Sequence, residues 1–91
     1  MNARFECIVH GRVQGIGYRA FAFKEASKLK VNGYTKNLMD ETVKVVAEAP
    51  KEILKEFLKK LEKGPSLGRV EKVKVDWSES ISEFQEFSIE Y

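Results

Sequence analysis

The alternation of apolar and polar positions along the chain begins as a strand and continues as a helix. Every second residue from Phe5 to Val9 is apolar, a period of two that is typical of a strand with one buried face. From about Ile16 to Lys30 the apolar positions recur every three or four residues, which predicts a helix. The pair Asn32 and Gly33 is a favoured helix stop, so we expect the helix to end near it.

The rest of the chain predicts four further strands and a second helix. Residues 33–49 predict two strands around a turn at Leu38 to Glu41, and Pro50 suits the first turn of a second helix. The apolar stripe of this helix is the strongest periodic signal in the chain and consists of Ile53, Leu54, Phe57, Leu58 and Leu61. Alternating apolar residues predict a fourth strand around Val73 to Trp77 and a short last strand from Phe87 to Tyr91.

The predicted order is therefore β-α-β-β-α-β with one additional C-terminal strand. This order is typical of the α+β ferredoxin-like sandwich, an antiparallel sheet with two helices on one face. With 91 residues and neither a linker nor a repeat, we expect residues 1–91 to form a single domain. Because unrelated functions occur on this fold, it does not by itself predict an activity.

Composition excludes several functional classes. Hydrophobic residues make up 43% of the chain and charged residues 33%, which is typical of a globular protein. The net charge is only +2, whereas general nucleic-acid or membrane binders usually carry a larger and clustered basic surplus. No apolar run is long enough for a membrane span or resembles the core of a signal peptide. We therefore expect a cytoplasmic protein, by default a monomer, with neither a nucleic-acid nor a membrane partner.

The chain contains one cysteine, Cys7, and one histidine, His10. It can form no intramolecular disulfide, and we expect no zinc site and no cofactor. Cys7 alternates with apolar neighbours, which favours a buried, unreactive thiol. His10 could act as a general base, but its place favours the sheet face or the loop edge.

The stretch "GRVQGIGYR", Gly11 to Arg19, joins the first predicted strand to the first helix. It lacks the Gly-Lys-Ser/Thr ending of the Walker loop, and the later glycine and acidic residue of the dinucleotide fingerprint. Unpaired N–H groups at a helix start, together with the helix dipole, nevertheless favour an anion there. Arg19 in the first helical turn opposes that dipole unless an anion lies beside it. A solvated arginine beside an ordinary turn is the alternative.

A second candidate is Asn37, which precedes the predicted turn at Leu38 to Glu41. A neutral amide carries both a donor and an acceptor, and it can therefore hold a water molecule without titrating. Asparagine near a hairpin turn is also common because its side chain caps the local backbone. The residue alone favours the capping interpretation.

Three segments, "VHGRVQGIGYR", "NGYTKNLMDETVKVVAEA" and "KGPSLGRVEKV", resemble the acylphosphatase family over nearly the whole chain. The resemblance implies hydrolysis of acyl phosphates to carboxylate and inorganic phosphate, without a metal. By match of motif, Arg19 is similar to the family's phosphate-binding arginine, and Asn37 to the asparagine that orients the attacking water. The implied phosphate-binding loop consists of Gln14, Gly15, Ile16, Gly17, Tyr18 and Arg19.

The second segment departs from the family pattern. Family members usually have glycine at the positions of Glu41 and Ala49, proline at that of Met39 and a small apolar residue at that of Thr35. Glu41 matters physically, because Asp-Gly readily adopts a primed hairpin turn and the pair Asp40 and Glu41 does not.

Two other functional classes use related small domains. RNA-recognition modules carry an aromatic motif that no segment here matches, and metal carriers need paired cysteines, which the chain lacks. A sensor that binds a phosphate group without turning it over stays open as an alternative.

Overall fold

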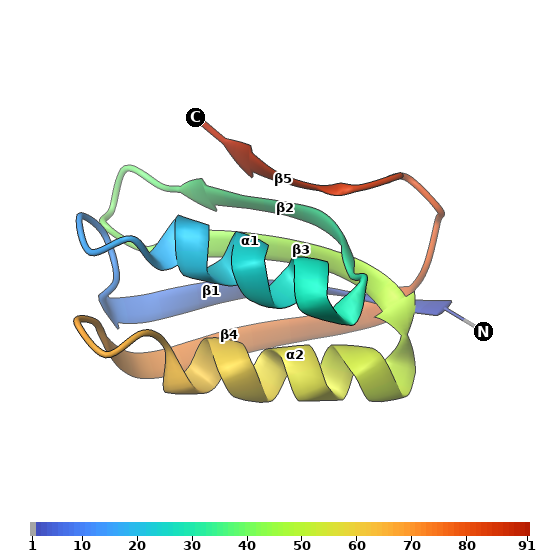
Figure 1. The fold of residues 1–91 in the computed structure, drawn as a ribbon, viewed down its shortest axis with the longest axis horizontal. Helices are drawn as coiled ribbons and strands as arrows, with labels where there is room; N and C mark the ends of the chain where they lie inside the picture. The colour runs from blue at the N-terminus through green and yellow to red at the C-terminus, as the bar shows by residue number, and fades with distance from the viewer. Residues whose placement is uncertain (1) are drawn as a thin grey trace.

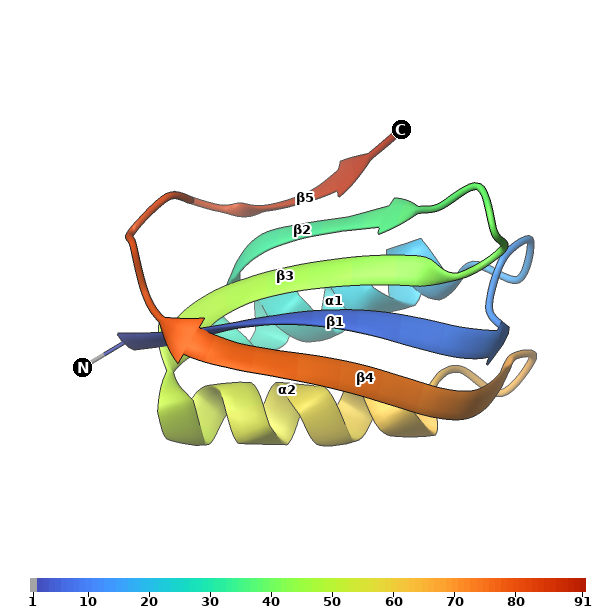
Figure 2. The same ribbon diagram turned by 180° about the vertical axis from the view of Figure 1, so that it is seen from behind.

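The computed structural model of the chain describes residues 2–91. Both helices lie on one face of a five-stranded sheet (Figure 1), and the opposite face of the sheet is seen in Figure 2. The elements are β1 (Asn2–Arg12), α1 (Tyr18–Leu29), β2 (Asn32–Asn37), β3 (Val43–Pro50), α2 (Lys51–Lys63), β4 (Arg69–Glu79) and β5 (Phe87–Glu90). The predicted ferredoxin-like sandwich is confirmed.

The strands lie in the order β4-β1-β3-β2-β5. The pairs β1–β3, β1–β4 and β2–β3 are antiparallel, whereas β5 runs parallel to β2. The last strand therefore departs from the expected antiparallel sheet. The reason is its connection, because residues 80–86 carry the chain from the β4 edge around the end of the sheet to the opposite edge (Figure 2).

The core lies between the helices and the alternate residues of β1 and β3 that face them. Its members are buried and include Phe5, Cys7, Val9, Val43, Val45, Ala47, Tyr18, Ala22, Ala26, Leu54, Phe57 and Leu61. Phe57 packs against Phe5 on β1 and Phe87 on β5, with ring centroids 6.2 and 5.9 Å apart. Burial raises the pKa of the Cys7 thiol to about 12, which agrees with the expected unreactive thiol.

The first helix ends at Leu29, within one residue of its predicted end near Lys30, but another residue forms its cap. Lys30 adopts the left-handed conformation with φ of 59°, and the N–H of Val31 bonds to the carbonyl oxygen of Ala26 at 2.9 Å. This is the bonding of a Schellman cap, in which Lys30 takes the place usually filled by glycine. Asn32 and Gly33 are instead the first residues of β2, so the end of the helix was predicted correctly but its stop signal was not.

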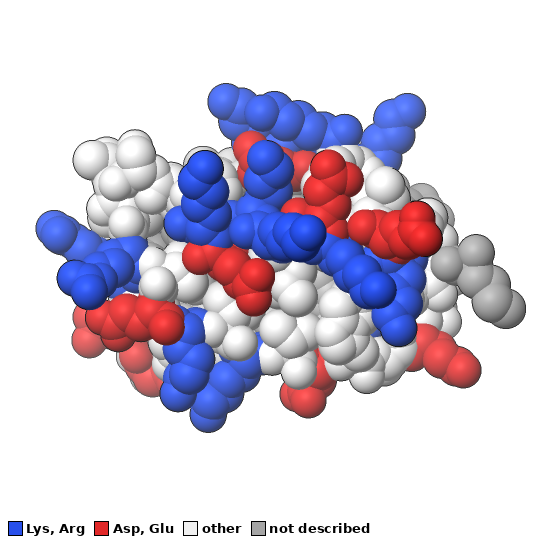
Figure 3. Space-filling model, turned by 90° about the horizontal axis from the view of Figure 1, so that it is seen from below, with Lys and Arg blue, Asp and Glu red and all other residues white. Residues whose placement is uncertain are grey.

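The outward face of α2 is charged and exposed. Lysine and glutamate side chains alternate there (Figure 3), as expected for a solvated helix face. Within residues 2–91, neither helix is long and apolar enough to cross a membrane.

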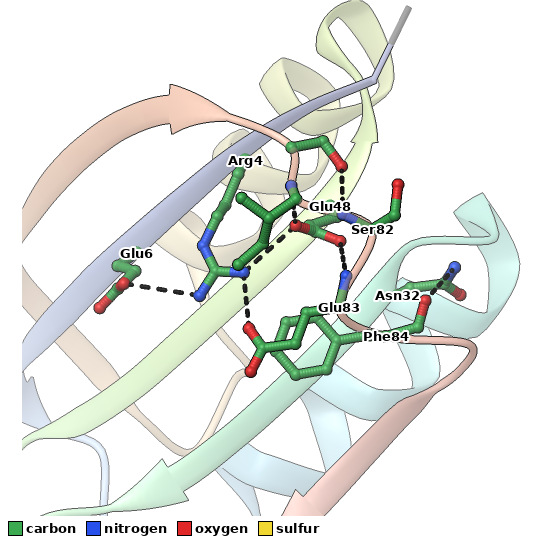
Figure 4. A network of polar contacts seen from close by, with 9 residues as sticks. Arg4, Glu6, Asn32, Glu48, Ser82, Glu83 and Phe84 are labelled. Atoms are coloured by element: carbon green, nitrogen blue, oxygen red, sulfur yellow. Dashed lines mark hydrogen bonds and ion pairs between the residues drawn. The ribbon is translucent and has the colours of Figure 1, made fainter.

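A buried carboxylate fastens the 80–86 segment to the sheet. Glu48 on β3 accepts hydrogen bonds from the N–H groups of Ile81 and Glu83, at 2.9 and 3.1 Å, and from the guanidinium of Arg4 at 3.2 Å (Figure 4). Arg4 also pairs with the Glu83 carboxylate at 2.9 Å. Burial opposes ionisation of Glu48, but these donors outweigh it and hold the pKa of the carboxyl below its ordinary value.

Glu48→Gln is expected to lower the free energy of unfolding by about 2 kcal/mol near neutral pH, because charge-assisted hydrogen bonds are lost. A depressed pKa stabilises the fold above the unfolded-state pKa of about 4.5, and this contribution disappears as the pH falls further. Urea unfolding should therefore show a smaller difference between the two proteins near pH 3 than near pH 7. Glu86→Gln, at an exposed position, is the control and should change little. A difference that is equal at both pH values would contradict this role of Glu48.

Candidate active site

Three segments far apart in the sequence meet at one end of the sheet. The loop between β1 and α1, the hairpin between β2 and β3, and the C-terminal residues surround a pocket of about 180 Å³. The loop and the hairpin lie at the same end of the molecule in Figure 1. Residues that line the pocket include Gly15, Gly17, Arg19, Asn37, Ile89 and Tyr91.

The loop between β1 and α1 presents a row of backbone donors. Gly15 and Gly17 have φ of 76° and 80°, in the left-handed region that side chains disfavour, and a Cβ on either would meet no atom within 4 Å. Gly17 is the N-cap of α1, and the first helical bond runs from the N–H of Phe21 to its carbonyl oxygen. Within residues 2–91, no hydrogen bond uses the N–H of residues 14–20 as its donor. These donors are free to bind an anion.

Arg19, in the first turn of α1, is held from the C-terminal side. Its Nη1 donates to the carbonyl oxygen of Glu90 at 3.2 Å, and its guanidinium carbon lies 4.8 Å from the centre of the Tyr91 ring. No carboxylate of the described residues forms an ion pair with it. The guanidinium thus keeps donors available beside the free N–H groups of the loop.

Asn37 ends β2 and shares a strand face with Thr35, which is fully buried opposite Val45. This face is turned toward the helices, and Asn37 lines the pocket there. In the part of the chain that the structure describes, its side-chain amide makes no hydrogen bond. The capping interpretation of Asn37 is therefore not supported.

Asp40 caps the hairpin instead. Its Oδ1 accepts hydrogen bonds from the Thr42 hydroxyl at 2.5 Å and from the Thr42 N–H at 3.2 Å. These two bonds, led by the hydroxyl, hold the pKa of the Asp40 carboxyl below its ordinary value. The N–H of Glu41 bonds to the carbonyl oxygen of Leu38, which confirms the predicted turn at Leu38 to Glu41. Asn37 is consequently left free to face the pocket.

Glu41 has φ of 72°, in the left-handed region where the resembling family usually has glycine. The glutamate Cβ is strained there, so Glu41→Gly should raise the free energy of unfolding by about 0.5 to 1 kcal/mol. Urea unfolding measures this change. Met39→Gly is the matched control, because Met39 is fully exposed on the same turn without a positive φ, and glycine there should destabilise slightly. A loss of stability in Glu41→Gly would contradict the assigned strain.

Two side chains of the loop, those of Tyr18 and Ile16, make their contacts with other parts of the fold. The Tyr18 hydroxyl donates to the carbonyl oxygen of Leu61 at 2.7 Å in the core, and burial raises the pKa of this hydroxyl. The Ile16 side chain lies against Gly68, where an added Cβ would be 2.8 Å from its Cδ1. Tyr18 and Ile16 can therefore serve the pocket through their backbone alone.

The Gln14 side chain points to the hairpin. Its Nε2 donates to the carbonyl oxygens of Leu38 and Thr42, each at 2.8 Å. From its sequence position Gln14 was expected in the phosphate-binding loop, and neither Ile89 nor Tyr91 was expected in the site. The alternation of Phe87, Ile89 and Tyr91 predicted a strand. The pairing of this strand, β5, with β2 brings Ile89 and Tyr91 to the pocket.

His10 lies on the other face of the sheet, because Phe5, Cys7 and Val9 of the same strand face the helices. The expected position on the sheet face is confirmed, and it separates His10 from the pocket. Among residues 2–91, no group of three or more His, Cys, Asp and Glu side chains could hold a metal ion.

Comparison with known proteins agrees with this arrangement. A family model described as Acylphosphatase matches residues 5–89. An acylphosphatase of Thermus thermophilus is 57% identical over 76 residues, which cover 84% of this chain and 86% of that protein. One of Bacillus licheniformis is 43% identical over 88 residues, covering 97% and 98%. The crystal structure of acylphosphatase from Bacillus subtilis has a TM-score of 0.94 at 37% identity and covers 98% of this chain and 99% of its own. The matched residues include the loop and the hairpin.

Proposed function

This chain belongs to the acylphosphatase family, and from this premise we propose how its pocket hydrolyses the carboxyl-phosphate bond of acyl phosphates. The products are a carboxylate and inorganic phosphate. The observation that carries the proposal is the convergence on one pocket of three kinds of donor. These are loop N–H groups and an Asn37 amide that make no hydrogen bond within residues 2–91, and an arginine without an ion pair there. This set of donors fits the three oxygens of a phosphoryl group and one attacking water molecule.

The loop and Arg19 bind the phosphoryl group. The N–H groups of Gln14 to Arg19 surround its oxygens, and the guanidinium adds a forked contact. Charge spreads over these oxygens in the transition state of phosphoryl transfer, so preformed donors lower the barrier. Tyr91 and the carbonyl oxygen of Glu90 hold the guanidinium in place before substrate binds.

Asn37 orients the attacking water. Its amide can accept a hydrogen bond from the water and donate one to it, and so place the water in line with the departing carboxylate. A carboxylate is a weakly basic leaving group, which removes the need for a general base. The position of His10 on the far face of the sheet is compatible with this mechanism.

Hydrolysis of benzoyl phosphate in excess EDTA, with inorganic phosphate as competitor, tests the proposal. We expect turnover that EDTA does not change and that phosphate inhibits competitively. Binding of phosphate without turnover would contradict hydrolysis and favour a sensor. Loss of turnover in EDTA would contradict the metal-independent mechanism.

We further propose that residues 1–91 act as a single-domain monomer in the cytoplasm. One core cluster that includes residues of both helices and of β1, β3 and β5 supports the single domain. The single, buried Cys7 requires no oxidising compartment. Size-exclusion chromatography with light scattering should give the mass of one chain, and a dimer mass would contradict the monomer.

A further inference from the structure

The phosphate-binding loop and the segment that carries Asn37 separate at the pocket end of the sheet. The last paired residues of β1 and β3 are Val9 and Val43. Beyond a register shift between His10 and Gly11, β1 continues along β4 alone. The sheet pairs Asn37 with Val43, and Val43 with Val9, but residues 13–17 lie beyond β1. The sheet therefore does not hold these loop residues against Asn37, although both must contact one substrate.

The Gln14 side chain bridges this gap. Its single amide nitrogen bonds to the two carbonyl oxygens at the mouth of the hairpin, those of Leu38 and Thr42. Leu38 directly follows Asn37, and Thr42 directly precedes Val43, the register partner of Asn37. The N–H of Leu38 also bonds to the carbonyl oxygen of Thr42, at 2.9 Å, across the base of the hairpin. Gln14 thus forms hydrogen bonds to both sides of the hairpin beside Asn37.

No other hydrogen bond in residues 2–91 joins residues 13–20 to residues 37–43. Both N–H groups of the Gln14 side chain are used in this link, so the side-chain nitrogen is not left to bind phosphate. On the basis of the proposed function, we infer that Gln14 is a positioning residue, whose side chain holds Asn37 in register with the phosphate-binding loop. The attacking water is placed through this contact, while the phosphoryl group is bound by the loop itself.

Gln14→Met tests the inference, because it keeps the length of the side chain and removes both donors. A small displacement of a water-orienting group lowers turnover strongly, so kcat for benzoyl phosphate should fall about 10- to 100-fold. The inhibition constant of inorganic phosphate should stay the same, because the N–H groups of the loop and Arg19 are intact. Gln85→Met, in the exposed segment at the opposite end of the sheet, is the matched control and should keep full kcat.

Gln14→Glu adds a readout that a purely structural role would not give. The ionised carboxylate has no donor for the two carbonyl oxygens, whereas the protonated carboxyl has one. As the pH falls, kcat of Gln14→Glu relative to the unsubstituted protein should rise. The same ratio for Gln14→Met should stay flat.

A double-mutant cycle identifies the residue through which Gln14 acts. In the Asn37→Ala background, Gln14→Met should cause little further loss of kcat, because the group that it positions is already absent. An undiminished effect in that background would overturn the inference. So would an unchanged kcat in Gln14→Met, or a weakening of phosphate inhibition that matches the loss of kcat. These results would leave the proposed function standing, since benzoyl phosphate turnover by the unsubstituted protein tests it separately.

Discussion

Arg19→Ala is expected to lower kcat/KM for benzoyl phosphate by at least about 100- to 1,000-fold, or about 3 to 4 kcal/mol. In the proposed mechanism the guanidinium contacts the phosphoryl group both in the bound substrate and in the transition state, so kcat should fall and KM should rise together. Inhibition by inorganic phosphate should weaken as well. The fold should survive, because Arg19 is not part of the core and forms no ion pair within the described residues.

Two further variants separate geometry from charge in this result. Arg19→Lys should recover only part of the activity, because an ammonium group cannot make the forked contact. Arg12→Ala removes the same charge two residues before Gln14 at an exposed position, and should therefore keep most of the activity. Near-normal hydrolysis by folded Arg19→Ala would rule out its proposed role, and an equal loss in Arg12→Ala would reduce that role to general electrostatics.

Asn37→Ala is expected to lower kcat about 100-fold with little change in phosphate inhibition, because the water loses its orienting group while the phosphate-binding loop stays intact. Steady-state kinetics with benzoyl phosphate measure both quantities. Stability should change little, since the Asn37 side chain makes no hydrogen bond in residues 2–91.

Asn32→Ala is the control at the other end of the same strand. The Asn32 side chain donates to the carbonyl oxygen of Phe84 at 3.4 Å, away from the pocket. Its loss should affect stability rather than kcat. If Asn37→Ala instead weakened phosphate inhibition as much as it lowered kcat, Asn37 would be a phosphate ligand and not a water-orienting residue.

The parts of the fold that the sequence predicted are those that depend on local periodicity. The stripe of α2 repeats at the helical period, and Leu54, Phe57 and Leu61 are buried as that period requires. The end of α1 near Lys30 was predicted, but its stop signal was not, because Lys30, a residue with no preference for the left-handed conformation, forms the cap in place of Asn32 and Gly33. Val31, the next residue, is buried, so tertiary packing outweighs the local signal at this point.

The part of the site that the sequence did not predict depends on pairing between distant segments. The last strand could be predicted from its alternation, but neither its direction nor its neighbour could be. The parallel register pairs Lys36 with Glu90, and continuation of it brings Tyr91 beside Asn37. Arg19 was identified from its place in the chain, whereas its contacts with Tyr91 and Glu90 depend on this pairing.

Asn37 shows how the structure decides between two interpretations of one residue. An asparagine next to a turn caps the backbone in many hairpins, and the sequence alone favoured that interpretation. In the structure Asp40 provides the cap through Thr42. The Asn37 side chain lines the pocket and takes no part in this cap.

We propose above all that the N–H groups of residues 14–19, together with the Arg19 guanidinium, bind the phosphoryl group. Titration of the ¹⁵N-labelled protein with inorganic phosphate, followed by amide chemical shifts, measures this contact directly. We expect the largest shifts on residues 14–19, with a Kd equal to the inhibition constant of phosphate in the hydrolysis assay. Shifts concentrated elsewhere while phosphate still inhibits, or none at the loop at saturating phosphate, would contradict this proposal.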